Sequence, residues 1–232
     1  MKHRIFAALT AGLLLCGILT GCGGKQETST TQQTAAPAAQ NGEAQADGEA
    51  QTGELPENTF IITLYPDKAP ITCENFENLV QEGFYDGLNF HRIVEGFMAQ
   101  GGDGTDAGKE AASIKGEFAA NGVQNDLSHT RGVVSMARTQ VMDSASSQFF
   151  ICYSDSCTFL DGNYAAFGKV TEGMEVVDQF LEVPRVMGMD GDISAPTSPV
   201  TMKSVVMIED DADGNPRVQV TMDDFMAGVK AE

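Results

Sequence analysis

Three stretches of the chain mix polar side chains with large apolar ones in a way that predicts a binding pocket. The first, 90–103, embeds an arginine and a glutamine among large apolar residues. A charge in such surroundings is costly unless it is paired or acts on something. The second is split between 135–138 and 147–151, and the third covers 159–170. Together they describe an apolar pocket with polar groups at its rim, which is typical of a small-ligand site.

Composition excludes other kinds of chemistry. The 232 residues include 33 acidic and 14 basic side chains, for a net charge of −19. Such a surface repels phosphate backbones, so we expect no nucleic-acid partner. The chain has only three histidines, which argues against a multi-histidine metal centre. We therefore expect neither a metal nor a cofactor.

Neither a nucleotide-binding motif nor a hydrolase motif is complete in this sequence. The segment 101–109 is glycine-rich and ends in lysine, like a phosphate loop. However, Asp103 stands where that loop needs its first glycine, and Glu110 replaces the hydroxyl residue that would hold magnesium. The chain also lacks the Gly-x-Ser-x-Gly turn that carries a hydrolase nucleophile.

Two metal motifs fail in the same way. The segment 211–215 begins like a calcium loop, but Pro216 replaces the turn glycine and Met222 replaces the final glutamate. Cys152 and Cys157 have no second pair to complete a zinc site. Outside the cytosol they could form a disulfide, and two free structural thiols are the alternative.

The three polar-apolar stretches closely resemble the cyclophilin family of peptidyl-prolyl cis-trans isomerases. They contain Phe-His-Arg-Ile-Val-Glu-Gly-Phe-Met-Ala-Gln-Gly-Gly-Asp from position 90, Ser-Gln-Phe-Phe-Ile from 147 and Phe-Leu-Asp-Gly from 159. The similarity extends from Thr59 to Glu209 and keeps the family's order of motifs. It implies a mainly β fold, a closed eight-stranded antiparallel barrel capped by two α-helices, and isomerase activity.

The resemblance implies a catalytic group. Arg92 matches the arginine whose guanidinium approaches the prolyl nitrogen. The amide barrier of about 18–20 kcal/mol comes from resonance, and a donor aimed at the nitrogen lone pair favours the twisted transition state. Gln100 matches the residue that orients this arginine and contacts substrate, and His91 matches a pocket-lining histidine. A hydrogen-bonded structural role is the alternative for His91, and a structural role is also expected for His129.

The resemblance also implies the residues that bind the substrate. Phe159 and Tyr164 stand where many eukaryotic members have tryptophan and histidine, as in bacterial cyclophilins, which weakens the expectation of tight cyclosporin binding. The positions that match the proline pocket are Phe97, Met98, Phe150 and Leu160. Those that match the wall along the bound peptide are Ala137, Arg138 and Gln148. The full set is Phe97, Met98, Ala137, Arg138, Gln148, Phe150, Phe159, Leu160 and Tyr164.

Local patterns predict the elements that must position these residues. β-Branched and aromatic runs indicate strands, and apolar residues at helical spacing indicate two helices. The first helix has Thr72 as its expected N-cap and ends at Gly83. The second covers 174–181. Strands are expected at 59–65, at 90–100 (one or two), and at 132–137, 147–152, 165–170 and 200–209.

The barrel that the resemblance implies lacks its first strand. Relatives have a strand before the one at 59–65, but 47–54 has no strand character here. An incomplete barrel would expose an edge. We predict that 217–222 fills the gap by pairing back along 200–209. Beyond it, 223–230 is expected to form a short helix, with a frayed tail as the alternative.

The N-terminal segment predicts export. Residues 1–21 start with basic side chains and continue into a 15-residue apolar run, shorter than the about 20 residues that span a bilayer. The sequence Leu-Thr-Gly-Cys ending at Cys22 resembles a bacterial lipobox. Lipid on Cys22 would anchor the protein to a membrane. An ordinary signal or a single membrane anchor is the alternative.

Four segments follow from these patterns: a lipoprotein signal peptide (1–21), the lipidated cysteine and a disordered linker (22–58), the isomerase domain (59–209) and an acidic C-terminal extension (210–232). We expect a membrane-anchored, extracytoplasmic isomerase whose partners are proline-containing unfolded or nascent exported polypeptides. A non-catalytic peptide-binding chaperone or adhesion module is the alternative. A solute-binding lipoprotein would need a longer chain.

Overall fold

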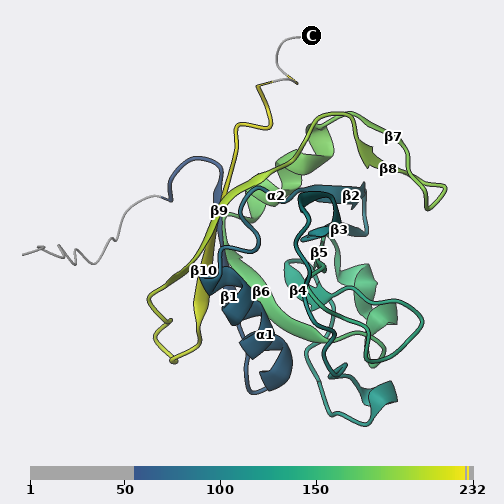
Figure 1. Cartoon of the computed structure of the whole chain (residues 1–232), viewed down its shortest axis with the longest axis vertical. Coiled ribbons are helices and arrows are strands. Elements are labelled where there is room, and N and C mark those ends of the chain that lie inside the picture. Colours follow the sequence, from purple (N-terminus) through teal and green to yellow (C-terminus); the bar gives the residue numbers. More distant parts are fainter. Residues whose placement is uncertain (1–54, 228, 230–232) are drawn as a thin grey trace, which may run out of the picture. The chain divides into compact units, whose positions relative to one another are not determined.

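The computed structural model of the chain describes residues 55–227 and 229. The predicted signal peptide, Cys22 and most of the predicted linker lie outside these residues. In the described part, eight antiparallel strands form one curled sheet in the order β2-β3-β5-β4-β6-β1-β10-β9 (Figure 1). Their bounds are β1 Thr59–Leu64, β2 Phe90–Val94, β3 Met98–Gly101, β4 Val133–Met136, β5 Phe149–Cys152, β6 Ala166–Glu172, β9 Met202–Ile208 and β10 Arg217–Met222.

The mainly β prediction is confirmed, but the sheet is a half-barrel and the expected closure is wrong. Its two end strands, β2 and β9, share no continuous ladder. They approach each other only at their ends, where 87–90 and 200–202 form one isolated bridge, Asn89 to Thr201, and a few backbone hydrogen bonds beside it. The ladder of β2 shifts between Phe90 and Arg92, and such a bulge bends a strand. Only the residues just before the bulge therefore reach β9.

The strand predicted to fill the gap in the sheet is present. β10 pairs antiparallel with β1 on one side and with β9 on the other. Its alternate residues Val218 and Val220 are fully buried, so the strand contributes to the core as well as to the ladder. The described part of the acidic extension is thus an integral strand of the sheet, followed by turns where 223–230 was expected to form a helix.

Two α-helices accompany the sheet, as predicted: α1 (Pro70–Gln81) and the shorter α2 (Met174–Gln179). The expected N-cap of α1 is wrong, because that position belongs to Ala69 and Thr72 lies inside the first turn. The N–H and the hydroxyl of Thr72 both donate to the buried carboxylate of Glu117, each at 2.7 Å. This carboxylate satisfies N–H groups that a helix start leaves without partners.

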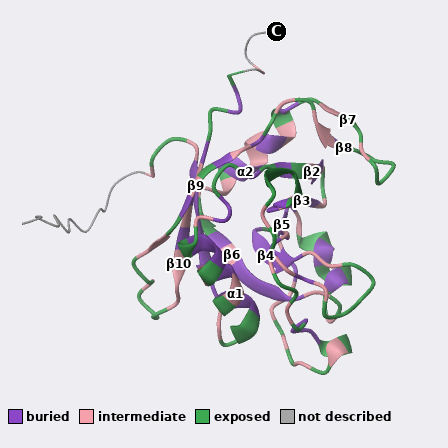
Figure 2. Ribbon diagram, viewed as in Figure 1, coloured by how far each residue is buried: buried purple, intermediate pink, exposed green. Residues whose placement is uncertain are grey.

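The core lies between the sheet and these helices. Figure 2 shows buried residues along β1, β4 and β6. Aromatic rings fill much of the space, with Phe76 of α1 in contact with the rings of Tyr85, Phe149 and Phe167. Within the described residues, no helix is both long enough and apolar enough to cross a bilayer.

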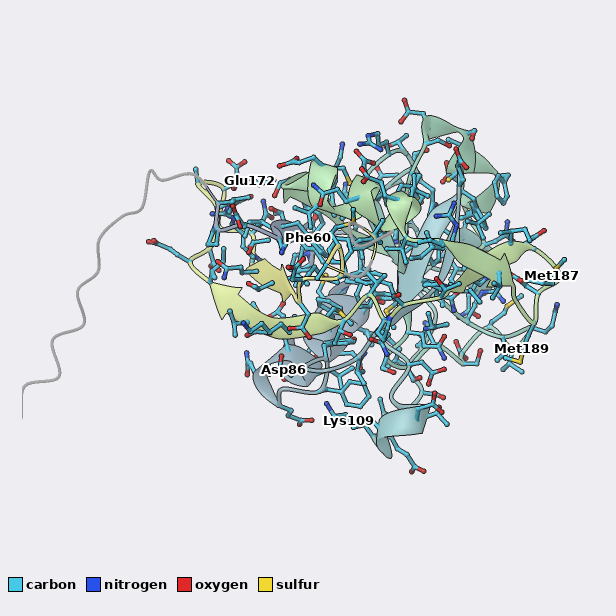
Figure 3. All side chains as sticks on the ribbon, turned by 90° about the horizontal axis from the view of Figure 1, so that it is seen from above. Phe60, Asp86, Lys109, Glu172, Met187 and Met189 are labelled. Atoms are coloured by element: carbon cyan, nitrogen blue, oxygen red, sulfur yellow. The ribbon has the colours of Figure 1, made fainter. Side chains whose placement is uncertain are left out.

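A two-stranded hairpin outside the main sheet has no counterpart among the predicted elements. β7 (Arg185–Met187) pairs antiparallel with β8 (Ile193–Pro196). Its apolar side chains face solvent, and Met187 and Met189 extend from the edge of the molecule in Figure 3. The pattern of a buried strand is therefore missing, although the Asp-Gly pair at 190–191 is a hairpin-turn signal. Short helical turns occupy the loops: η1 Thr105–Ala107, η2 Ala119–Asn121, η3 Asp155–Leu160 and η4 Phe180–Glu182.

Candidate active site

Nine of the twelve residues predicted at the active site surround one hollow of about 330 Å³, which we name the apolar hollow. They come from β2, β3 and the turn between them, from β5, from the segment after β4, and from the segment between β5 and β6. The structure thus brings together parts of all three polar-apolar stretches. The nine are Arg92, Phe97, Met98, Gln100, Ala137, Arg138, Phe150, Leu160 and Tyr164.

Strand register explains how distant residues meet here. In the ladders, Arg92 is the partner of Gln100, and Gln100 is the partner of Phe150. Residues directly opposite each other project from the same face of a sheet. Met98 lies two residues from Gln100 and therefore faces the same way. The sheet itself arranges a row of guanidinium, amide and aromatic ring.

The walls of the apolar hollow belong to a small buried cluster separate from the main core. Met98 and Phe150 are 1% and 5% exposed, and the ring of Phe150 meets that of Tyr164 edge-on at 5.9 Å. Partly buried side chains complete the rim. The cluster comprises Met98, Phe150, Cys152, Cys157 and Leu160, with Val94, Phe97, Ala137 and Tyr164 packed against it.

Cys152 and Cys157, for which the sequence allowed either a disulfide or two free thiols, are free thiols behind this wall. Both are buried, and the Cys157 thiol donates to the carbonyl of Phe97 at 3.2 Å. Burial raises the pKa of the Cys152 thiol well above its ordinary value, with Cys157 adding to the effect. They act as small apolar residues of the wall.

Arg92 lies between the apolar wall and a carboxylate of the hairpin. Its Nε donates to Oδ2 of Asp190 at 2.5 Å, and its Nη1 lies 3.7 Å from the sulfur of Met98. The guanidinium carbon is 5.9 Å from the centre of the Phe97 ring. The hydrogen bond from Arg92, assisted by one from Ser194, lowers the pKa of Asp190 to about 2. The sequence reasoning missed Asp190, and its position in an Asp-Gly hairpin turn was the available signal.

Gln100 is held by a second amide rather than by the arginine. Its Nε2 donates to Oε1 of Gln148 at 2.8 Å, and Nε2 of Gln148 donates to Oδ2 of Asp103 at 2.9 Å. Hydrogen bonding to Thr105 lowers the pKa of Asp103 despite partial burial, so this chain ends in a carboxylate. Among the hydrogen bonds of the described residues, none joins Gln100 to Arg92, and the orienting role of Gln100 stays a prediction.

Arg138 closes the other side of the apolar hollow. Its guanidinium carbon lies 4.7 Å from the ring centre of Tyr164 and 4.9 Å from that of Phe118. Nε and Nη1 donate to the carbonyls of Asn163 and Thr139, both at 2.9 Å. Stacking on the two rings holds the guanidinium in place, so Arg138 gives this part of the rim a fixed positive charge.

Three of the predicted residues do not line the apolar hollow. Gln148 lies behind Gln100, as described above. Phe159 is 66% exposed, and its ring is 5.5 Å from that of Phe97 at the outer rim. His91 lines a neighbouring hollow of about 850 Å³, the hairpin hollow, to which Arg92 and Asp190 also contribute.

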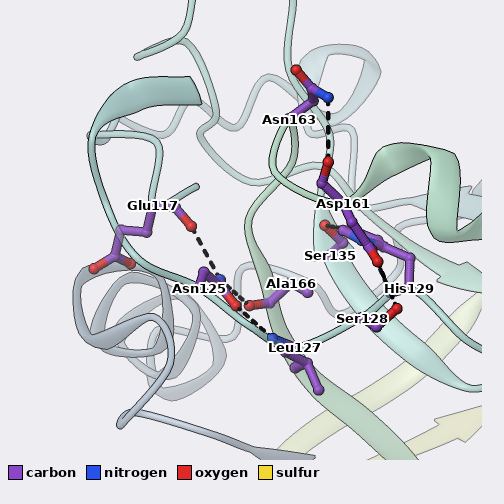
Figure 4. A network of polar contacts seen from close by, with 9 residues as sticks. All are labelled: Glu117, Asn125, Leu127, Ser128, His129, Ser135, Asp161, Asn163 and Ala166. Atoms are coloured by element: carbon purple, nitrogen blue, oxygen red, sulfur yellow. Dashed lines mark hydrogen bonds and ion pairs between the residues drawn. The ribbon is translucent and has the colours of Figure 1, made fainter. Parts of the chain in front are cut away.

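A buried polar network supports the wall from behind (Figure 4). Nδ1 of His129 is 2.7 Å from Oδ1 of Asp161, and its Nε2 is 2.9 Å from the hydroxyl of Ser135. The set resembles a Ser-His-Asp triad, but Ser135 is fully buried and no substrate reaches it. The imidazole stacks on Phe150 at 6.1 Å, and Asp161 directly follows Leu160. These contacts fix two walls of the apolar hollow.

Burial and hydrogen bonding act in opposite directions on the pKa values of this network. Burial lowers the pKa of His129, an effect that Asp161 offsets only in part. Burial raises the pKa of Asp161, but hydrogen bonds from the His129 N–H, Ser128 and the imidazole outweigh it and lower the pKa overall. Across the described residues, no group of three or more histidine, cysteine, aspartate and glutamate side chains is arranged to hold a metal ion.

Comparisons with known proteins agree with this geometry. Residues 49–207 match the family described as cyclophilin type peptidyl-prolyl cis-trans isomerase/CLD. A peptidyl-prolyl cis-trans isomerase of Acinetobacter baylyi is 47% identical over 62% of this chain and 77% of its own length. Peptidyl-prolyl cis-trans isomerase B of Escherichia coli is 40% identical over 65% of this chain and 94% of its own length.

A solved structure extends the likeness to three dimensions. The crystal structure of a Cryptosporidium parvum cyclophilin type peptidyl-prolyl cis-trans isomerase, in the presence of the dipeptide Ala-Pro, matches with a TM-score of 0.55 and 29% identity. The match covers 64% of this chain and 92% of that one. The curled antiparallel sheet, together with these relatives, places the chain among mainly β isomerases. The chain belongs to the cyclophilin family and is a peptidyl-prolyl cis-trans isomerase.

Proposed function

We propose that this enzyme catalyses X-Pro isomerisation in exported polypeptides, through Arg92 and the apolar hollow. The observation that carries the proposal is the position of the Arg92 guanidinium at the rim of that hollow, beside Met98 and Phe97. Uncatalysed X-Pro isomerisation takes tens to hundreds of seconds and limits folding. A folding catalyst outside the cytoplasm would remove that delay.

Substrate binding starts with the prolyl ring. Apolar walls of Met98, Phe150 and Leu160 accept an apolar ring and exclude water from it. The Ala-Pro dipeptide named with the Cryptosporidium parvum relative supports a prolyl ligand. Arg138 and Gln100 place hydrogen-bonding groups at the rim for the backbone on either side of the proline, and Gln148 holds Gln100 in place.

Arg92 then weakens the amide resonance of the X-Pro bond, and no covalent bond is formed or broken. With the ring seated, a guanidinium N–H directed at the prolyl nitrogen binds its lone pair best when the amide is twisted and the nitrogen is pyramidal. The contact is stronger in the transition state than in the ground state, which is the condition for catalysis. Preorganised donors of this kind typically contribute about 10²–10³ in rate.

The mechanism transfers no proton. Arginine stays protonated at any working pH, and Asp190 stays ionised because its pKa is held at about 2. His91 faces the hairpin hollow and needs no acid-base role. The chemical step itself is therefore expected to be insensitive to pH between about 5 and 9.

The N-terminal sequence supports export and anchoring. A short apolar run followed by Leu-Thr-Gly-Cys predicts lipid on Cys22, and the polar linker of 36 residues that follows would span about 30–36 Å as a coil. A Cys22→Ser variant should move from the membrane fraction to the soluble fraction and lose labelled fatty acid. Retention in the membrane with no label in the wild type would contradict lipid anchoring.

The activity itself is tested by exchange spectroscopy. The protein starting after Cys22 is added to an X-Pro peptide, and to the same peptide with alanine in place of proline as a control. We expect the enzyme to accelerate cis-trans exchange of the prolyl peptide and to leave the spectrum of the alanyl peptide unchanged. Binding of the prolyl peptide without faster exchange would instead identify a peptide-binding chaperone or adhesion module.

A further inference from the structure

The side chain of Arg92 is held from outside the main sheet. Its ion pair with Asp190 at the tip of the β7–β8 hairpin joins residues that are 98 positions apart. Both side chains are mostly covered, at 27% and 22% exposure. Among the described residues, Asp190 is the only carboxylate that forms an ion pair with Arg92. The hairpin therefore reaches the reactive group directly.

The carboxylate of Asp190 is fixed before it meets the arginine. Its Oδ1 accepts from the hydroxyl of Ser194 at 2.8 Å and from the backbone N–H of Asp192 at 3.1 Å. The turn is closed by a hydrogen bond from the Gly188 N–H to the Asp192 carbonyl at 2.8 Å. One oxygen is thus bound within the hairpin, and the other is left to bind Arg92. A donor or acceptor held in this way needs no reorganisation during the reaction.

The ion pair selects one orientation of a flexible side chain. With Nε bound to Asp190, Nη1 is directed to Met98 at the wall of the apolar hollow. On the other side lies the hairpin hollow of about 850 Å³, which has room for the guanidinium if the ion pair is lost. Gln100 makes no hydrogen bond to Arg92 within the described residues, and its Nε2 donates to Gln148 instead. Accurate placement matters, since an error of about 1 Å at a reacting centre can cost about 100-fold in rate.

We propose that Asp190 is a positioning residue for catalysis, which holds the Arg92 guanidinium over the apolar hollow from the tip of the β7–β8 hairpin. The inference rests on the proposed function of Arg92. Asp190 acts through Arg92, so its loss should lower kcat more than it raises KM.

The test measures kcat and KM for an X-Pro peptide with Asp190→Asn, Asp190→Glu and Asp192→Asn. We expect Asp190→Asn to lower kcat/KM roughly 5- to 50-fold, and Asp190→Glu to restore part of the loss. Asp192 is the matched control, because it carries the same charge two residues away while its side chain makes no hydrogen bond within the described residues. Asp192→Asn should match the wild type.

Combining the change with Arg92→Ala gives the decisive comparison. Asp190→Asn should have no further effect in that background, since the group it positions is absent. The same loss in both backgrounds would overturn the inference, and so would an Asp190→Asn enzyme as fast as, or faster than, the wild type.

A second readout does not depend on turnover. In the NMR spectrum, the Arg92 Nε–H signal should be protected from solvent exchange in the wild type and unprotected in Asp190→Asn. An unprotected wild-type signal would overturn the positioning role. If the wild type lacks activity but its signal is protected, the proposed function fails while the contact stands.

Discussion

The wall of the apolar hollow and the β7–β8 hairpin both reach Arg92, but they are built differently. The wall is made by central strands, and its residues Met98 and Phe150 are almost fully buried. The hairpin forms its own two-stranded sheet, and its side chains Val186, Met187 and Ile193 are each more than half exposed. One region is positioned by dense packing and the other by a few polar contacts.

Because the two regions are built differently, substitutions in them should affect stability and activity to different extents. Close packing restrains each residue of the wall through many neighbours, so a change there disturbs the fold and the site together. The hairpin tip contributes little buried surface, yet its carboxylate bonds the proposed catalytic group. Substitution of Asp190 should therefore change activity, whereas substitutions at exposed tip positions should alter stability by no more than about 0.5 kcal/mol.

The largest expected effect comes from removing a strand of the sheet. Deleting 212–232 removes β10, so β9 loses its ladder partner and β1 keeps only its ladder with β6. Burial of Val218 and Val220 alone contributes about 3–6 kcal/mol, which is comparable to the whole stability of many domains. We expect thermal unfolding to show a large fall in Tm or no cooperative transition.

The matched change in the hairpin is Met189→Ser, at a fully exposed side chain of the tip. It should leave Tm nearly unchanged. A deletion of 212–232 that kept the wild-type Tm would show that β10 is dispensable and would remove the contrast between the two regions.

A smaller effect compares two aromatic residues at the same site. Phe150 is buried in the wall, whereas Phe159 is 66% exposed at the rim. Phe150→Ala should cost about 3–5 kcal/mol in the free energy of urea unfolding, and Phe159→Ala should cost about 0.5 kcal/mol. Equal costs would mean that the wall is not held by packing. Isomerase assays below the unfolding range should show a larger loss for Phe150→Ala.

The smallest effect is a pH dependence of stability to which His129, behind the wall, contributes. Burial lowers the pKa of His129 despite its contact with Asp161, so below about pH 6.5 the unfolded chain takes up a proton that the folded state resists. Stability should then fall as the pH falls from about 6.5 to 5, by at most about 1.4 kcal/mol per pH unit. The Asp190 contact stays ionised throughout, because its pKa of about 2 is far below this range.

His129→Gln supplies the control for this pH effect, since glutamine has hydrogen-bonding groups but does not titrate. Urea unfolding at several pH values should show the acid-side slope in the wild type and a weaker one in the variant. An equal slope in both would assign the pH dependence to other groups.

Much of the fold follows from local sequence because buried strands carry a strong signal. All six residues of Thr59–Leu64 are buried, and all of them except Leu64 are β-branched or aromatic. The absence of strand character before it, together with the alternation in 217–222, was enough to predict that β10 fills the gap. Thr72 was misassigned because its N-cap-like hydroxyl bonds a distant carboxylate, Glu117, which no local pattern shows.

The site divides in the same way. Residues of the wall come from long motifs on adjacent strands, so their convergence could be predicted from the family resemblance. Asp190 lies in an exposed hairpin outside those motifs, and its contact with Arg92 joins residues far apart in the chain. Closure of the barrel was expected from the family resemblance and is wrong, because it depends on how the two end strands pair, which no local pattern in the sequence shows.

The most direct test of the central claim is the isomerisation rate of Arg92→Ala beside the wild type. The account predicts a fall in kcat/KM of about 10²–10³, with an unchanged Tm because the Arg92 side chain is a partly exposed rim group. Arg92→Lys should recover little, since a lysine lacks the planar fork that binds Asp190 and the substrate together. Comparable rates in the wild type and Arg92→Ala would contradict the account.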